Sequence, residues 1–417
     1  MIKNVGITLL FALLIGSAYS QTTINVMSYN VLNYPLGDMQ DRADTLKVIT
    51  DYVQPDLFLL QELKSEEGLQ TILQTCFGES ETPFMASEFV PQISNPNSSW
   101  KLQQALIYNS EMFGLAEQDE RTSVVRDLNI FKMYFKDEQH LEGDTTYLYV
   151  FVTHLKSSQG DDNEQSRLEM MESFTNYFDD LPEDALALFG GDFNVYNSGE
   201  PAYQLIVNIN NHLVWKDPIE APGNWHSSAY PFRQVHTQST RTGEIFGDGS
   251  GGGMDDRFDF IMASQALMDG NSPIHYAPFT YEALGNTGDC YNGTILDCSQ
   301  DNPLPPEMLT ALYHMSDHLP VVMQLEAINA VSIEEAPEFI LNIASLQSEN
   351  LQFQLKSNGA FTAKAKLFDL HGNLIQNWQE QTGRTINFRS QTPTSSGVYV
   401  LVIESDQGTI RRKVMIQ

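Results

Sequence analysis

Polar side chains suited to binding a metal ion or a phosphate stand at the ends of short apolar runs. In the stretch 185–195, ALALFGGDFNV, an apolar run leads into Asp192 and Asn194. A short apolar run bounded by glycine predicts a core strand, and we expect Gly190 and Gly191 to turn the backbone sharply after it. The carboxylate and the amide could then hold a metal ion, a water or a phosphate. The plainer alternative is an Asx turn.

The same pattern recurs along the chain. Predicted strands end at or just before Asn30, Glu62 and His154, and another predicted strand carries Asp259. The last predicted strand directly follows Asp317 and His318. Each has a plainer interpretation as a surface charge, a core histidine or a turn cap. If the strand ends converge on one sheet edge, the set suits metal-assisted hydrolysis of a phosphate ester, which needs no Cys or Ser nucleophile.

These residues depend on a series of alternating strands and helices. Period-2 and apolar runs predict strands at 23–30, 57–60, 104–108, 128–135, 146–153, 258–262 and 319–325. Apolar positions at helical spacing predict helices at 41–53, 66–76, 163–178 and 200–208. The remaining long segments are predicted to be loops: 31–37, 84–100, 211–256 and 279–313. The glycine run in 247–256 lacks the Gly-Lys-Ser/Thr of a nucleotide-binding P-loop.

Charge is distributed unevenly over the 417 residues. Residues 21–327 hold 46 acidic and 14 basic side chains, whereas residues 328–417 hold eight of each. An acidic surface attracts cations and repels nucleic acid at long range, which argues against tight, processive DNA binding. It does not exclude a hydrolase whose metal ions neutralise the cleft locally.

The termini differ in character from the rest of the chain. Residues 1–20 have the basic, apolar and small-residue regions of a secretory signal peptide, and we expect no membrane span elsewhere. Residues 328–339 predict a linker, and residues 340–417 predict a small all-β domain. Cys290 and Cys298 lie in one loop and could pair, which an exported protein permits.

The motifs together resemble the endonuclease/exonuclease/phosphatase superfamily. They are SYNVLNY, LLQEL, VTHLKS, GGDFNV, RFDFIM and SDHLPV, and they occur in the family's order within residues 23–326. The resemblance implies an α/β fold for residues 21–327. That fold is a four-layer sandwich of two mainly antiparallel sheets face to face, with helices outside.

The resemblance also implies roles for single residues. Asn30, Glu62 and Asp317 would bind Mg²⁺, a hard cation that prefers oxygen ligands, with Mn²⁺ or Ca²⁺ as alternatives. Asp192 would orient or deprotonate the attacking water. Asn194 would hold that water or a phosphate oxygen.

Other residues would meet the phosphate itself. His318, oriented by Asp259, would contact the phosphate that gains charge in the transition state. His154 would contact it as well, and Arg126 lies where the family often places a phosphate-binding arginine. Three residues of FRQVHTQSTR are candidates for the cleft wall or for solvated loop positions: Arg233, His236 and Arg241.

The tail resembles a second family, the C-terminal sorting domain of the type IX secretion system. The segment SGVYVLVI, followed by Gly408 and KVMIQ, carries this resemblance. It implies export to the cell surface or beyond, with the secretion machinery as a partner. The alternative is an ordinary small β-sandwich that binds another protein.

These observations predict a secreted, Mg²⁺-dependent phosphoesterase, expected as a monomer, that acts as a nuclease on extracellular DNA or RNA. Two alternatives stay open. The first keeps the chemistry but takes a phospholipid head group or a phosphomonoester, which an acidic surface would favour. The second is a non-catalytic secreted binding protein on the same fold.

Overall fold

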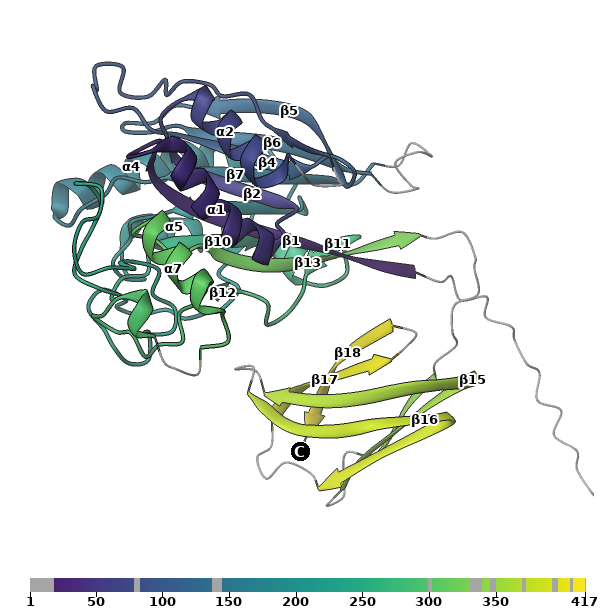
Figure 1. The fold of residues 1–417 in the computed structure, drawn as a ribbon. Helices are drawn as coiled ribbons and strands as arrows, with labels where there is room; N and C mark the ends of the chain where they lie inside the picture. The colour runs from purple at the N-terminus through teal and green to yellow at the C-terminus, as the bar shows by residue number, and fades with distance from the viewer. Residues whose placement is uncertain are drawn as a thin grey trace, which may run out of the picture. The chain divides into compact units, whose positions relative to one another are not determined.

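The chain divides into two units of internal contacts. The large unit is Gln21–Asn329, and Ala330–Gln417 lie in the other. The structure, a computed structural model, describes residues 19–78, 83–136, 145–298, 302–330, 340–345, 350–369, 373–391, 397–405 and 408–416 (Figure 1). The predicted signal peptide lies almost entirely outside these residues, as does most of the predicted linker.

Two sheets form the large unit (Figure 1). The first has the order β11-β13-β1-β2-β4-β3, with β12 beside β13, and the second has the order β5-β6-β7-β8-β10-β9. The pairs β1/β2 and β7/β8 are parallel. Antiparallel pairs join β2 to β4, β3 to β4, β11 and β12 to β13, β5 to β6, β6 to β7, β8 to β10, and β9 to β10. The strands of the first sheet are β1 Tyr19–Tyr34, β2 Leu57–Leu63, β3 Phe84–Ala86, β4 Gln103–Asn109, β11 Ile274–Tyr276, β12 Glu282–Ala283 and β13 Val321–Ala330. Those of the second are β5 Phe113–Arg121, β6 Leu128–Phe135, β7 Tyr147–His154, β8 Ala187–Asp192, β9 Trp215–Lys216 and β10 Asp259–Ser264.

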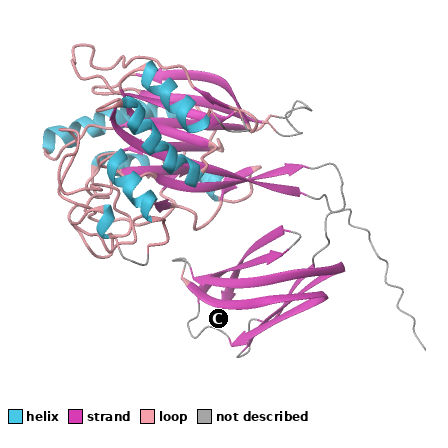
Figure 2. Ribbon diagram, in the orientation of Figure 1, coloured by secondary structure: helices cyan, strands magenta, loops and turns pink. Residues whose placement is uncertain are grey.

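Three apolar clusters hold the layers together. One joins side chains of both sheets, among them Leu59 and Leu188, and therefore fills the space between them. A second packs α1, α2 and α7 on the first sheet, and a third packs α4 and α5 on the second. The helices are α1 Met39–Val53, α2 Glu66–Phe77, α4 Asp161–Phe178, α5 Pro201–Ile206, α6 Gln265–Met268 and α7 Pro306–Met315, with a 3₁₀ turn η1 Ile295–Asp297 (Figure 2). The implied four-layer α/β sandwich is confirmed.

Two elements, β5 and α7, were not predicted from the sequence. β5 was not predicted, because its polar run EQDER lies at the edge of the second sheet, where most side chains are not buried. α7 begins within the predicted loop 279–313 and ends two residues beyond it. It buries Met308, Leu312 and Met315 against the first sheet.

The two glycines before Asp192 are strand residues, so the predicted sharp turn was wrong. A Cβ at Gly190 would lie 2.6 Å from Cδ2 of Leu59, on the facing sheet. A Cβ at Gly191, whose φ is +144°, would lie 1.9 Å from the carbonyl oxygen of Thr153 on the neighbouring strand. Glycine is needed here because the neighbouring strand and the facing sheet approach too closely, not because the backbone turns.

This close approach predicts a large stability effect. We expect Gly191→Ala to lower the free energy of unfolding by about 3 kcal/mol, because the new methyl group meets fixed backbone. Gly243→Ala is the matched control, since no atom lies within 4 Å of a Cβ built there. Urea unfolding measures both. Equal midpoints for the two variants would contradict the account.

The other unit is all β, as predicted. β15 Asn350–Asp369 pairs with β14 Ile340–Ser345, β16 Leu374–Gln391 and β17 Gly397–Ser405, and β17 pairs with β18 Gly408–Ile416. Every one of these pairs is antiparallel, and an apolar cluster that includes Phe353, Trp378 and Phe388 packs between them.

Cys290 and Cys298 form a disulfide, while Cys76 is free and buried. Among the described residues, no helix is both long and apolar enough to cross a bilayer.

Candidate active site

The two sheets bring their polar strand ends to one place. In the second sheet, His154 of β7 and Asp259 of β10 are each the register partner of Asp192 on β8, so these three residues stand in a row. In the first sheet, Asn30 on β1 is paired with Gln61, the residue before Glu62 on β2. The expected convergence on one edge is therefore present.

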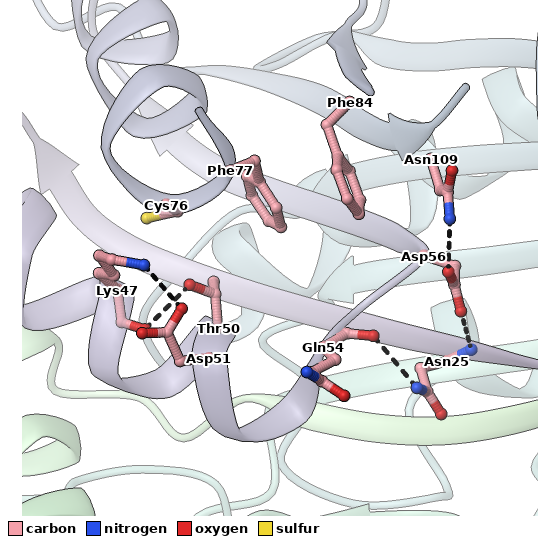
Figure 3. A pocket seen from close by; sticks show the side chains of 10 residues that line it. All are labelled: Asn25, Lys47, Thr50, Asp51, Gln54, Asp56, Cys76, Phe77, Phe84 and Asn109. Atoms are coloured by element: carbon pink, nitrogen blue, oxygen red, sulfur yellow. Dashed lines mark hydrogen bonds and ion pairs between the residues drawn. The ribbon is translucent and has the colours of Figure 1, made fainter. Parts of the chain in front are cut away.

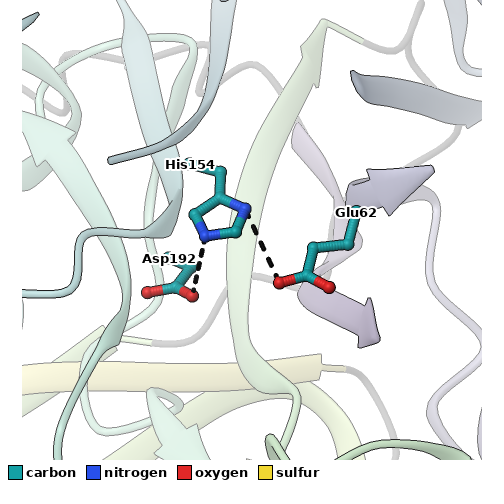
Figure 4. Close-up of side chains that lie close together, drawn as sticks. All are labelled: Glu62, His154 and Asp192. Carbon is teal, nitrogen blue, oxygen red and sulfur yellow. Dashed lines mark ion pairs between the residues drawn. The ribbon is translucent and has the colours of Figure 1, made fainter. Parts of the chain in front are cut away.

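Side-chain contacts cross from one sheet to the other. Nδ2 of Asn30 donates to Oε1 of Glu62 at 2.9 Å and to Oδ2 of Asp192 at 3.1 Å. The His154 ring lies between the same two carboxylates, with Nε2 at 3.4 Å from Asp192 and Nδ1 at 3.7 Å from Glu62 (Figure 4). Burial, aided by Arg126, holds the pKa of His154 well below its ordinary value, so the ring is neutral.

His318 has a fixed orientation. Its Nδ1 lies 2.8 Å from Oδ2 of Asp259, which also accepts a hydrogen bond from the hydroxyl of Thr237 at 2.6 Å. Nε2 therefore points toward Asp192, 3.7 Å away. Burial would lower the pKa of His318, but the carboxylates around it, led by Asp259, raise the pKa well above its ordinary value. The ring is thus suited to carry a positive charge into the site.

Asp192 combines the two interpretations that its sequence allows. Its Oδ1 accepts the backbone N–H of Asn194 at 3.0 Å, and Asn194 has a φ of 51°, so an Asx turn forms at the strand end. The turn leaves Oδ2 facing Asn30 and the two histidines. Burial and the nearby carboxylates, despite His318, raise the pKa of Asp192 to about 8.

Asp317 enters from the loop before β13. Its Oδ2 accepts hydrogen bonds from the backbone N–H of Ser250 at 2.6 Å and from the Gln238 amide at 3.2 Å, while its buried Oδ1 has no partner. The same amide nitrogen lies 2.7 Å from Nε2 of His318, a contact that requires an unprotonated ring. We take the ring as protonated because Asp259 and Asp317 raise its pKa, and the Gln238 amide must then turn its oxygen toward Nε2.

The donor set fits a divalent cation. Glu62, His154 and Asp192 offer ligand atoms within 4.8 Å of one another. A protonated His318 has no free nitrogen to offer, and the predicted ligand Asp317 is in no such group among the described residues. Burial and the charge of Asp317 raise the pKa of Glu62. Too little positive charge therefore lies nearby to offset the negative charge of these carboxylates. Unpartnered buried oxygens of Asp317 and Asp259 add acceptors. Oxygen-rich sites of this kind suit Mg²⁺, Mn²⁺ or Ca²⁺.

Most of these residues line a cleft of about 400 Å³, but Asn30 and Asp259 are not among its lining residues. Arg126 lies in its wall and donates to the carbonyl of Leu155 at 2.8 Å. The other three basic candidates are not among the lining residues. Arg233 is exposed, and His236 is buried with Nε2 against the carbonyl of Trp225. Arg241 is buried with its guanidinium 5.9 Å from the centre of the Phe246 ring and with no hydrogen-bond partner among the described residues.

The segment FRQVHTQSTR contributes Gln238 to the cleft instead. Neither Gln238 nor Ser250 was predicted, since nothing in a loop sequence marks an amide or a backbone N–H as a carboxylate partner. Asn33 was also missed, because it lies in the predicted loop 31–37, whereas the observed β1 continues to Tyr34. Its backbone N–H donates to Glu62 at 2.7 Å.

A second hollow lies beside α1, α2 and β3, near the opposite end of β2 (Figure 3). Its polar side chains are paired with one another. Lys47 contacts Asp51 at 2.8 Å, and Asp56 accepts from the Asn109 amide at 3.0 Å. We assign no chemistry to this hollow.

Comparisons with known proteins follow the division of the chain. Residues 347–417 match the family model of the secretion system C-terminal sorting domain, which confirms the resemblance of the tail. No curated protein shows significant similarity to the chain.

Several solved structures are similar to the larger part of the chain. A family protein of this superfamily from Bacteroides thetaiotaomicron is 17% identical, over 74% of this chain and 97% of that chain, with a TM-score of 0.47. Humanized D. rerio TDP2 is 16% identical, over 73% and 98%, with a TM-score of 0.45. The human Nocturnin catalytic domain with bound sulfate is 15% identical, over 75% and 98%, with a TM-score of 0.46. At these identities the likeness concerns the fold alone, and function must follow from the site.

The raised pKa values predict how stability depends on pH in chelator. Between about pH 4 and pH 8 an unfolded Asp192 loses its proton while the folded one keeps it, so folding becomes less favourable as pH rises. His318 acts in the same direction above its unfolded pKa. His154 and His236, whose pKa values are lowered by burial, act in the opposite direction below about pH 6.5. We therefore expect the Tm in EDTA to fall from pH 7 to pH 8, and Asp192→Asn to flatten that fall. A wild-type Tm that rises from pH 7 to pH 8 would contradict this.

Proposed function

We propose that this chain is a secreted, divalent-metal-dependent phosphodiesterase that acts as a nuclease on extracellular nucleic acid. The observation that carries the proposal is the network of contacts that joins Asn30 and the Asp259–His318 pair to Glu62, His154 and Asp192. Four of these side chains line one cleft: Glu62, His154, Asp192 and His318. The sorting domain in the tail supports export.

The chain's residues divide the work of hydrolysis among them. Asn30, Glu62 and Asp317 would hold the cation, which when bound supplies positive charge to offset the phosphoryl oxygens. Asp192 accepts a proton from the attacking water, and its raised pKa makes its ionised form a stronger base than an ordinary carboxylate. Asn194 keeps the water and the phosphate in line.

Charge that develops on the phosphate meets cationic and hydrogen-bonding groups. His318, held by Asp259, presents a protonated Nε2 to the phosphoryl oxygens. Arg126 contributes a fixed positive charge from the cleft wall. His154 is neutral, so it can donate one hydrogen bond toward the leaving oxygen without adding charge.

The acidic composition of residues 21–327 favours a second candidate, a phosphodiesterase or phosphatase for lipid head groups or small phosphates. One substrate panel separates the candidates. The full chain is assayed with Mg²⁺ on single-stranded DNA, duplex DNA, RNA, sphingomyelin vesicles and inositol phosphates. We expect the highest kcat/KM with nucleic acid. Preference for sphingomyelin or inositol phosphates would favour the second candidate, and no turnover of any ester would overturn both.

A further inference from the structure

The lining of the active-site cleft includes an exposed aromatic ring and a cation, Trp100 and Arg126, and further cations lie close by. Trp100 lies just before β4 and lines the cleft together with Glu62 and Arg126. Its side chain is 52% exposed. The ammonium group of Lys64 lies 4.3 Å from the centre of its ring. The pairing of Leu63 with Gln103 brings the end of β2 to the start of β4, and so explains how the two side chains meet.

Several cations near Trp100 and the cleft lack an acidic partner in the described part of the chain, which is unusual in a unit with so many acidic side chains. Lys64, Arg126 and Lys156 have no acidic partner within ion-pair distance among the described residues. By contrast, Arg167 and Arg257 are bound to carboxylates. Lys156 and Arg126 are near enough to His154 to lower its pKa further. Cations left unpaired beside a phosphoesterase cleft are available to phosphates that flank the reacting one.

The ring of Trp100 is positioned in advance of any ligand. A cation over an indole face is attracted by the ring quadrupole and limits how the ring turns. More than half of the side chain nevertheless stays open to solvent. A flat, oriented, exposed ring beside unpaired cations is the combination that binds an unpaired nucleobase with its adjacent phosphate.

We infer that Trp100 and Lys64 form a subsite for one unpaired base and its phosphate, which makes single-stranded nucleic acid the preferred substrate. This rests on the proposed phosphodiesterase function and names its substrate class. A base inside a duplex is stacked on both faces and cannot stack on Trp100, whereas a base in a single strand can. A single strand also presents less phosphate charge to the acidic surface around the cleft than a duplex does.

Binding can be measured without catalysis. The chain has four tryptophans, and Trp215, Trp225 and Trp378 are each at most 6% exposed, so stacking in the cleft affects Trp100 alone. We expect (dT)₁₂ in EDTA to quench tryptophan fluorescence of the full chain, a duplex of the same length to quench much less, and Trp100→Phe to abolish the signal. Equal quenching by both nucleic acids, or quenching that survives Trp100→Phe, would overturn the inference.

Kinetics give the second test. Base stacking on an aromatic side chain corresponds to a loss of about 5- to 160-fold on substitution by alanine. Trp100→Ala should therefore lower kcat/KM for a single-stranded oligonucleotide by this factor, and at least fivefold more than for bis(4-nitrophenyl) phosphate, which has no base. Trp100→Phe should recover most of the loss, because it retains an aromatic face.

A matched control exists on the same chain. Tyr147 is 40% exposed under the ammonium group of Lys132 at 4.8 Å, but it lies at the opposite end of β7 from His154. Tyr147→Ala should leave both activities unchanged. If the wild type cleaves the small diester but no oligonucleotide, the subsite is overturned while the phosphodiesterase stands. If it cleaves neither, the proposed function itself fails.

Discussion

The Asp192→Asn protein should hydrolyse a phosphodiester about 10³-fold more slowly than wild type at pH 8 with Mg²⁺. The amide retains the size of the side chain and can still accept the N–H of Asn194, now 3.0 Å from Oδ1. It cannot take a proton from water. The loss should therefore appear in kcat rather than in KM.

Asp56→Asn is the control for this prediction. Asp56 also accepts two hydrogen bonds, from the Asn25 backbone and the Asn109 amide, but it lies before β2, away from the cleft. We expect its kcat to stay within about twofold of wild type. Equal losses in Asp192→Asn and Asp56→Asn would show that the effect is structural and would remove Asp192 from the proposed chemistry.

The second large effect concerns His318. Replacement by alanine should lower kcat by about 10²- to 10³-fold, because a charged donor directed at the phosphoryl oxygens is lost. Asp259→Asn should cost less, since Asp259 acts by orienting the ring and raising its pKa. Steady-state kinetics on one diester measure both variants.

His314→Gln provides the comparison for His318. His314 is exposed in the last turn of α7, only four residues before His318. Its replacement should leave kcat unchanged. A His318→Ala protein that keeps more than a third of the wild-type kcat would contradict the role given to this ring.

The site residues that could be predicted from the sequence are those that stand at the end of an apolar strand. Asn30, Glu62, His154 and Asp192 each follow an apolar strand, and the strand register alone brings His154 beside Asp192. Their motifs occur in one order, so the fold that aligns them could be inferred from resemblance. The short helix α5 and the strand β6 were also predicted close to their observed bounds.

The loop contributions could not be predicted in the same way. Residues 211–256 contain Arg233 and His236, which were chosen by chemical type, yet Gln238 is the side chain that meets Asp317 and His318. Loop backbone decides which of these neighbours faces the cleft, and no periodicity records it. The prediction of a turn at the glycines before Asp192 was wrong for a related reason. The neighbouring strand and the facing sheet, rather than the local backbone conformation, require glycine there.

Metal dependence tests the central claim most directly. The full chain is freed of metal with EDTA, dialysed, and assayed on a single-stranded oligonucleotide while Mg²⁺ is added. We predict no turnover without metal, recovery on addition of Mg²⁺, and a requirement for at least about tenfold more Mg²⁺ in Glu62→Gln, which loses a charged ligand. Hydrolysis that persists undiminished in EDTA, in both wild type and Glu62→Gln, would contradict the account.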